Sequence, residues 1–449
     1  MTTARLTEWK TQSAAIARLA GPLVINNLAV AGMGFADAVM AGRLGAKTLA
    51  AVAVGSSTWF LAFTVGLGIL MAISPIAAQL HGAGRRRKIG RYTRQGLYFA
   101  LALGIPLIYA GQYAVEPALT AIGIDPGFRD LTVGYTKAIL FGAPGMFMFL
   151  ALRFTTEGIG HTRPIMYSSI FALACNVFLN WVFMYGNLGV PAMGARGCGI
   201  ASAISMWLVM IALAGYVVVS PRYRELGIFS RFAPPRPGVL REIVVLGIPI
   251  AVTITAEAGL FNAVSILVGT LGATITAAHQ IALNFAATLF MVPLGLSSAA
   301  TIQVGQLIGA EDYERARIAG AAGIGLCGSF MTASAVFLLV FRDAVVSLYT
   351  DDPAVLGIAL SLLAMVTIFQ IADGVQIGAA AVLRGYKDTR YAMVINVFAY
   401  WVIAFPFAYM AAKVWRSPPN TIWASFVVGL TIAATLLTWR FVRLSRVRG

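Results

Sequence analysis

Apolar stretches of roughly 20 residues or more recur along the whole chain, and each is long enough to cross the ~30 Å hydrocarbon core of a bilayer as a helix. Charged residues make up only 11% of the 449 positions, whereas soluble globular proteins carry about 25%. A soluble protein is therefore excluded, and the sequence predicts an all-α polytopic membrane protein. We expect twelve transmembrane helices, near residues 15–43, 48–80, 93–116, 131–156, 163–186, 197–219, 241–270, 275–308, 316–341, 354–384, 390–413 and 419–441.

The basic residues sort by membrane side. Of the 33 Lys and Arg residues, 25 fall in the termini and the even-numbered loops, which leaves eight for the odd-numbered loops. By the positive-inside rule, both termini are expected in the cytoplasm. The densest run, Arg85-Arg86-Arg87-Lys88, is interpreted chiefly as a topology signal, although such runs can also bind anionic lipid headgroups. The net charge of +16 therefore needs no nucleic-acid partner.

Metal chemistry and cofactors are not expected. Three Cys residues are too few and too scattered for a disulfide framework or a metal cluster, and three His residues show no ligand-like spacing.

The two halves of the chain match each other at one constant offset of 227 residues. The matched pairs include Pro22 and Pro249, Gly68 and Gly295, and Gly158 and Gly385. Six spans make one repeat, so both halves enter the membrane from the same side and form a parallel repeat, and substrates of such transporters usually bind near the repeat interface. The matched prolines are expected to bend the first and seventh spans.

This duplication predicts two pseudo-symmetric six-helix lobes that rock against each other. A linker rich in Pro and Arg joins them. The expected parts are a cytoplasmic N-terminal segment (1–14), an N-lobe (15–219), a cytoplasmic linker (220–240), a C-lobe (241–441) and a cytoplasmic tail (442–449).

Three carboxylates, Asp37, Glu257 and Asp373, stand alone inside apolar spans. A charge at bilayer depth costs at least ~2.5–3.5 kcal/mol, so such residues usually face a cavity and serve an ion, proton or substrate pathway. None of the three recurs at the offset of 227. Each lobe is therefore expected to carry its own polar site.

In the N-lobe, Asp37 is expected to face an amide pair. Asn176 and Asn180 are four residues apart in the fifth span and share one helical face. A carboxylate with two carboxamides suits a cation or a proton. The alternative is that Asp37 and the two Asn residues form separate interhelical hydrogen bonds, which are common in membranes.

In the C-lobe, Glu257 and Asp373 are expected to share a cavity with several amides. Gln370 and Gln376 flank Asp373 at intervals of three on one face of its helix. Gln280 and Asn284 form another such pair in the eighth span. The alternative is a protonated structural pair of Glu257 and Asp373.

The remaining acids are interpreted as solvated charges at helix ends or in loops. Glu157, for example, is expected to pair with Arg153 one turn away. In contrast, burial of an intramembrane carboxylate lets a proton compete with a cationic ligand for the same oxygen atoms. Mutually exclusive binding of this kind is all that antiport requires at one site.

These features resemble the multidrug and toxic compound extrusion (MATE) family over essentially the whole chain. The resemblance is carried by the twelve spans in two parallel lobes, by Asp37 in residues 33–42 (MGFADAVMAG), by Glu257 in the seventh span and by Asp373 in residues 371–376 (IADGVQ). Because both C-lobe acids are present, the chain is similar to the bacterial NorM branch rather than to the DinF branch.

The resemblance implies a transporter, not an enzyme, that exports small cationic drugs or dyes in exchange for sodium ions or protons. It implies that Asp37 with its two Asn neighbours, and Glu257 with Asp373, couple transport to the ion. Some NorM-like members carry a Tyr one turn before the tenth-span acid, where this chain has Phe369, and this departure concerns the sodium site. The expected setting is a monomer among the lipids of a bacterial cytoplasmic membrane.

Two other functions use intramembrane polar residues. A flippase for lipid-linked precursors would need basic groups in its cavity, and no Lys or Arg lies near the middle of a predicted span. An intramembrane aspartyl protease would need a Gly-X-Gly-Asp pattern, which Ala372-Asp373 does not supply. The sequence is compatible with sodium or protons as the coupling ion, with a range of cationic substrates, and with either face open at rest.

Overall fold

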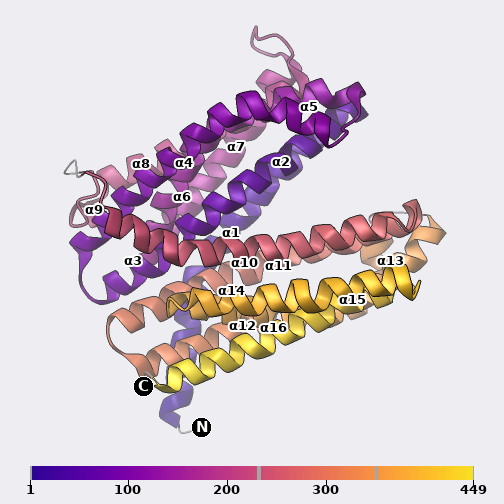
Figure 1. Cartoon of the computed structure of the whole chain (residues 1–449). Coiled ribbons are helices and arrows are strands. Elements are labelled where there is room, and N and C mark those ends of the chain that lie inside the picture. The colour runs from indigo at the N-terminus through magenta and orange to yellow at the C-terminus, as the bar shows by residue number, and fades with distance from the viewer. Residues whose placement is uncertain (1–2, 230–233, 348, 350–351, 448–449) are drawn as a thin grey trace. The chain divides into compact units, whose positions relative to one another are not determined.

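The computed structural model describes residues 3–229, 234–347, 349 and 352–447, and every regular element within these ranges is a helix (Figure 1). Twelve helical segments of this part of the chain are long and apolar enough to cross a membrane. The predicted all-α polytopic fold with twelve spans is thus confirmed.

The spans follow the predicted order. The first six are α1 (Thr3–Arg43), α2 with α3 (Ala46–Met71, Ile73–Gly82), α4 (Arg86–Ala121), α5 with α6 (Pro126–Ile139, Ala143–Gly158), α7 (Arg163–Tyr185) and α8 (Gly194–Val219). After the short α9 (Pro221–Arg224) come α10 (Pro237–Gly269), α11 (Ala273–Gly309), α12 (Tyr313–Ser347), α13 (Pro353–Gly385), α14 with α15 (Thr389–Val397, Phe405–Tyr409) and α16 (Pro419–Val447). Two π-helical stretches, Phe398–Ala404 and Met410–Val414, interrupt the eleventh span.

Each half of the chain packs its helices in the same way. In the second half, α13 lies against α11, α12 and α16. In the first half, α6 lies against α3, α4 and α8, which are the equivalent spans. Single contacts repeat as well: Gly158 approaches the Ser74 carbonyl oxygen, and Gly385 approaches that of Thr301, 227 residues further along. The two lobes are pseudo-symmetric, as predicted.

The described helices gather into two compact units, and the division falls inside two long helices. The N-lobe unit is Ile25–Ala251, and the C-lobe unit joins the chain up to Val24 to the chain from Val252 onward. Both boundaries lie two residues after a matched proline, Pro22 or Pro249, where a missing N–H weakens the helix. The predicted lobes, 15–219 and 241–441, each included the whole of their first helix. The limits of the compact units therefore differ from the limits of the predicted lobes by about half a helix.

Close glycine contacts explain this division. Within the N-lobe unit, a Cβ atom added to Gly68 of α2 would lie 2.2 Å from the Cα atom of Ala251 in α10. Within the C-lobe unit, a Cβ atom added to Gly295 of α11 would lie 2.5 Å from a methyl carbon of Val24 in α1. The two contacts are equivalent under the offset of 227. Each unit thus includes the first half of the helix that opens the other repeat.

The predicted linker is fixed to α4 over much of its length. Arg94 donates hydrogen bonds to the carbonyl oxygens of Gly227 and Ile228, and the backbone N–H of Arg236 donates to Gln95 Oε1 at 2.7 Å. Gly90 makes this possible, because a Cβ atom there would lie 1.9 Å from the carbonyl oxygen of Leu226. The linker is therefore part of the N-lobe unit and not a loose tether. Residues 230–233 of the predicted linker lie outside the described part.

Candidate functional site

The N-lobe unit brings Asp37 of α1 together with the two predicted amides of α7. Asn180 Nδ2 donates to Asp37 Oδ1 at 2.5 Å and also lies 3.3 Å from Asn176 Oδ1. Both Asn side chains are buried, whereas Asp37 is half-buried. One amide therefore binds the carboxylate directly, and the second amide orients the first.

Two residues of α8 complete this group, and the sequence analysis missed both. Ser202 Oγ donates to Asp37 Oδ2 at 3.3 Å, and the Cys198 thiol lies within hydrogen-bonding reach of the same carboxylate. They are four residues apart and so share one helical face. That spacing within an apolar span was the available signal. Both oxygen atoms of Asp37 thus have donors.

The C-lobe unit brings its two acids together. Glu257 of α10 and Asp373 of α13 are close enough for their charges to interact, and both act on Tyr400 of the π-helical stretch. Asp373 is only 5% exposed and Tyr400 is fully buried. Single-turn π-helical segments inside α-helices are frequent at functional sites, so the interruption at Phe398–Ala404 marks this region independently of the acids.

Many polar atoms around Asp373 have no hydrogen-bond partner within the described chain. Buried polar atoms in proteins are nearly always paired, so such a group indicates bound water or an ion. The atoms are Asp373 Oδ1, both side-chain amide atoms of Gln376, Gln370 Nε2 and the Tyr400 hydroxyl. On the other side of its amide, Gln370 Oε1 accepts from Ser334 at 3.3 Å. The cluster supplies several oxygen atoms that suit a hard cation.

Three predicted supporting residues take other positions. Phe369 is 2% exposed, and its ring centroid lies 6.5 Å from that of Phe261 and 5.7 Å from that of Trp423. It is one wall of an aromatic cluster beside the acids. Gln280 and Asn284 are exposed on α11, and neither has a hydrogen bond to Glu257 or Asp373 in the part of the chain that the structure covers.

The charged surroundings differ from the prediction in one respect. Glu157 pairs with Arg153 at 2.7 Å as expected, but the pair is buried, because the side chains are only 2% and 14% exposed. The interpretation of Glu157 as a solvated charge was therefore wrong: the pair lies in the interior of the N-lobe unit, where α6 packs against α3 and α4.

None of the three intramembrane acids forms an ion pair with a Lys or Arg of the described chain. Arg384, in the last turn of α13, nevertheless acts on Glu257 by its charge.

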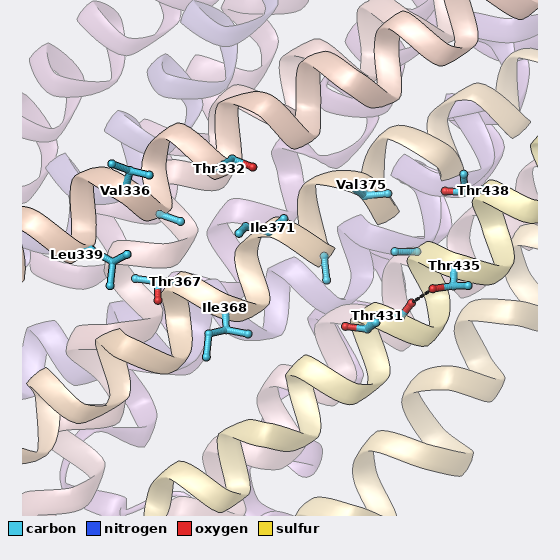
Figure 2. A pocket seen from close by; sticks show the side chains of 13 residues that line it. Thr332, Val336, Leu339, Thr367, Ile368, Ile371, Val375, Thr431, Thr435 and Thr438 are labelled. Carbon is cyan, nitrogen blue, oxygen red and sulfur yellow. Dashed lines mark hydrogen bonds between the residues drawn. The ribbon is translucent and has the colours of Figure 1, made fainter.

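A cavity of about 730 Å3 lies between α12, α13 and α16 of the C-lobe unit (Figure 2). Ile371 and Val375 of α13 line it. Both are two residues from Asp373, hence about 200° around the helix from the acid. Its other labelled residues are mainly Thr and aliphatic, and Ile368 is 51% exposed. The cavity is an apolar groove on the far face of α13 and does not contain the candidate site.

No three His, Cys, Asp or Glu side chains gather as a metal site in the described ranges. The groups at the two sites are carboxylate, amide and hydroxyl oxygens, which are ligands that suit hard cations.

Comparisons with known proteins agree with this architecture. The MatE family profile matches residues 22–182 and 249–410, two copies that begin 227 residues apart. The multidrug resistance protein NorM of Aliivibrio fischeri is 37% identical over 433 residues, which cover 96% of this chain and 94% of that protein. NorM of Vibrio cholerae is 37% identical over 445 residues, covering 98% and 97%. A solved outward-facing multidrug resistance MATE family transporter has a TM-score of 0.88 at 21% identity and covers 97% of this chain and 96% of that chain.

Proposed function

Because this chain belongs to the MatE family, as the two profile matches and the NorM relatives establish, we propose that it is a secondary active multidrug efflux antiporter. The resemblance predicted from the sequence is confirmed, and the chain is a transporter of the NorM type rather than an enzyme. The intramembrane protease alternative is thereby removed. The relatives are named multidrug resistance proteins, and the exchange proposed for this chain is of cationic amphipathic compounds for sodium ions or protons.

The observation that carries the proposal is the under-paired polar cluster around Asp373. Two neighbouring buried carboxylates cannot both remain charged at low cost unless a proton or a cation compensates them. Around them, Gln376 and Tyr400 contribute buried oxygen atoms without partners in the described chain. A dehydrated cation could replace its water ligands with these oxygens, and a proton could instead neutralise one acid. Either ion would be a reversible occupant.

Asp37 is proposed to act differently. Its oxygens already accept hydrogen bonds from Asn180 and Ser202. Protonation of Asp37 would remove charge from these bonds and so weaken them, which links the protonation state to the packing of α1 against α7 and α8. We infer that Asp37 controls the position of α1, whereas Glu257 and Asp373 hold the coupling ion.

The transport cycle is proposed to be a rocking motion of the two lobes around the substrate. The weakened points at Pro22 and Pro249 are suitable hinges, since the compact units divide two residues later in both helices. Both termini are proposed to be cytoplasmic in a bacterial inner membrane, on the distribution of Lys and Arg, and the working form is proposed to be a monomer without a cofactor. The available drive is about 2.3 kcal/mol per charge per 100 mV.

Efflux from proteoliposomes with separately imposed gradients tests this function. Purified protein is reconstituted with the cationic dye ethidium inside, and a sodium gradient, a pH gradient or a membrane potential is applied alone. We expect one of the two ion gradients to accelerate dye release, and dye addition in turn to drive that ion outward. Dye release that responds to neither sodium nor pH would overturn antiport and favour passive or potential-driven movement.

A further inference from the structure

The N-lobe unit contains another cavity, of about 560 Å3, between α4, α5 and α8. Arg196, Ile200 and Trp207 form its wall on α8. Cys198, which faces Asp37, lies about 180–200° around the helix from all three, because each residue advances the helix by about 100°. The cavity is therefore on the opposite face of α8 from the candidate coupling site.

Its polar end carries two cations. Lys137 of α5 and Arg196 of α8 line the cavity together with Gln112 of α4. Lys137 Nζ lies 3.5 Å from a carboxylate oxygen of Glu116, whose side chain is 63% exposed, so water screens this pair. No Asp or Glu of the described chain forms an ion pair with Arg196. The cavity thus has a net positive charge.

Topology does not explain these cations. The end of α4 and the start of α8, which carries Arg196, lie on the membrane side opposite the termini, because each is separated from the N-terminus by an odd number of spans. Lys137 is in the last turn of α5 and lines the same cavity as Arg196. The positive-inside rule leaves that side poor in Lys and Arg. Two cations in one cavity there need another reason, and a bound anion supplies one.

The cavity is ordered along the membrane normal as a phospholipid is. Arg196 lies in the first turn of α8, and Ile204 and Trp207 follow deeper along the same face; eleven residues of helix span about 17 Å. Lys137, in the last turn of α5, is followed one turn later by Phe141, which lies in the short 3-10 helix Leu140–Gly142 and is 53% exposed. The Trp207 indole N–H donates to the Phe141 carbonyl oxygen at 3.0 Å and fixes this apolar floor.

We propose that this cavity binds an anionic phospholipid of the leaflet opposite the termini. The phosphate lies between Lys137 and Arg196, where charge-assisted hydrogen bonds form, and the upper acyl chain lies along Ile204 and Trp207. A free phosphate ion would leave the apolar floor unused. A zwitterionic headgroup would place its ammonium group near two cations, and Glu116, which contacts this cluster, is already paired with Lys137. An anionic lipid matches both ends.

Native mass spectrometry of the purified full-length protein tests the site with defined lipids. We expect phosphatidylglycerol to bind more tightly than phosphatidylcholine of the same chain length. Lys137→Gln and Arg196→Gln should each weaken phosphatidylglycerol about fivefold, the factor that corresponds to about 1 kcal/mol per cation near a lipid surface, and the double variant about 25-fold. The matched control is Arg342→Gln, which removes an exposed cation near the same membrane surface, at the end of α12.

A second readout does not depend on the charge variants. Phosphatidylglycerol brominated in the upper acyl chain should quench part of the tryptophan fluorescence of the wild-type protein. This part of the quenching should be absent in Trp207→Phe, and brominated phosphatidylcholine should produce less of it in the wild type. Equal binding of the two lipids, an unchanged affinity in the double variant, or no difference between wild type and Trp207→Phe would overturn the proposal. Displacement of the lipid by equimolar inorganic phosphate would also overturn it, and would indicate a small-anion site. Because no transport is measured, these results are independent of the antiport test.

Discussion

The two polar sites of this protein differ in how well their oxygen atoms are paired. In the N-lobe unit, Asp37 accepts hydrogen bonds at both carboxylate oxygens, from Asn180 and Ser202. In the C-lobe unit, Asp373 is more deeply buried, yet Oδ1 has no partner in the described chain, and the same holds for both amide atoms of Gln376. In the N-lobe group Asn180 Oδ1 alone among the described atoms lacks a partner, whereas the C-lobe group has several such atoms.

Both sites have the same sequence pattern, an acid with nearby amides. The difference in hydrogen bonding nevertheless indicates two different roles for them. A cation needs several free lone pairs at short range, and among the described residues the C-lobe cluster offers several where the N-lobe group offers Asn180 Oδ1. An acid whose oxygens are occupied by donors can instead change the strength of those hydrogen bonds when it gains a proton. Ion selectivity should therefore reside in the C-lobe and conformational control in the N-lobe.

The strongest test of the division is the double variant Glu257→Gln, Asp373→Asn. Without an ionisable oxygen in the C-lobe cluster, we expect the response of dye efflux to an imposed ion gradient to fall to that of protein-free liposomes. Ion-jump experiments on proteoliposomes measure this response. Asp343→Asn is the matched control, since Asp343 is an exposed acid near the end of α12. A retained ion response in the double variant would move the coupling ion to Asp37.

The N-lobe counterpart, Asp37→Asn, should slow efflux without changing which ion drives it. Hydrogen bonds to a charged group contribute about 1.5–3 kcal/mol each, so losing one in the cycle predicts efflux that is roughly 10–150-fold slower. Ser202→Ala, which removes only the long 3.3 Å donor, should slow efflux about tenfold, for about 1.5 kcal/mol, the lower end of that range. The ratio of sodium-driven to proton-driven rates is the decisive measurement. A shifted ratio would contradict the division of roles.

The features that could be predicted from the sequence are those that depend on residues close together along the chain. Span length, charge sorting and the offset of 227 follow from composition along the chain, and they indicated the twelve helices and the two lobes. The isolation of Asp37, Glu257 and Asp373 is equally local. The pairing of Asn180 with Asp37 followed from a shared helical face in an otherwise apolar span.

The partners that were missed depend on the rotation of one helix against another. Ser202 and Tyr400 look like ordinary membrane residues until α8 and the π-helical stretch turn them toward an acid. The same rotation exposes Gln280 and Asn284, whose spacing resembled that of the correctly placed Asn pair. The burial of Glu157 with Arg153 was missed because a helix end at the membrane surface was assumed to meet water. Packing of α6 against α3 and α4 excludes water there.

The repeated glycine contacts allow a smaller test of the comparison between lobes. The Cβ atom of Gly68→Ala would meet the backbone of Ala251, which cannot move aside, whereas that of Gly295→Ala would first meet a methyl group of Val24. Overpacking typically costs about 1–3 kcal/mol of stability. We therefore expect Gly68→Ala to lose stability near the upper end of this range and Gly295→Ala to lose stability near its lower end. Thermal unfolding of the detergent-solubilised variants gives the order. Equal losses of stability in the two variants would show that α1 is held as rigidly as α10. The control is Gly238→Ala, because Gly238 has open space around it.

The smallest predicted effect concerns the linker on the N-lobe unit. Arg222 Nη1 donates to His161 Nε2 at 3.2 Å, which requires an unprotonated ring nitrogen. Burial, and then the charges of Arg222 and His81, lower the pKa of His161 below its ordinary value; the neighbouring Tyr223, whose pKa burial raises to about 12, stays neutral.

Stability at this contact is therefore fully present above about pH 6.5, the pKa of a free His, and is lost as the pH falls, because the unfolded chain binds the proton more readily. Since His161 is half-exposed, we expect less than about 1 kcal/mol. Thermal unfolding between pH 5 and 8 should show a steeper acid loss for wild type than for His161→Gln, which accepts the same hydrogen bond without titrating. Parallel curves would mean that the contact of Arg222 with His161 does not hold the linker, and that the bonds from Arg94 and Gln95 suffice.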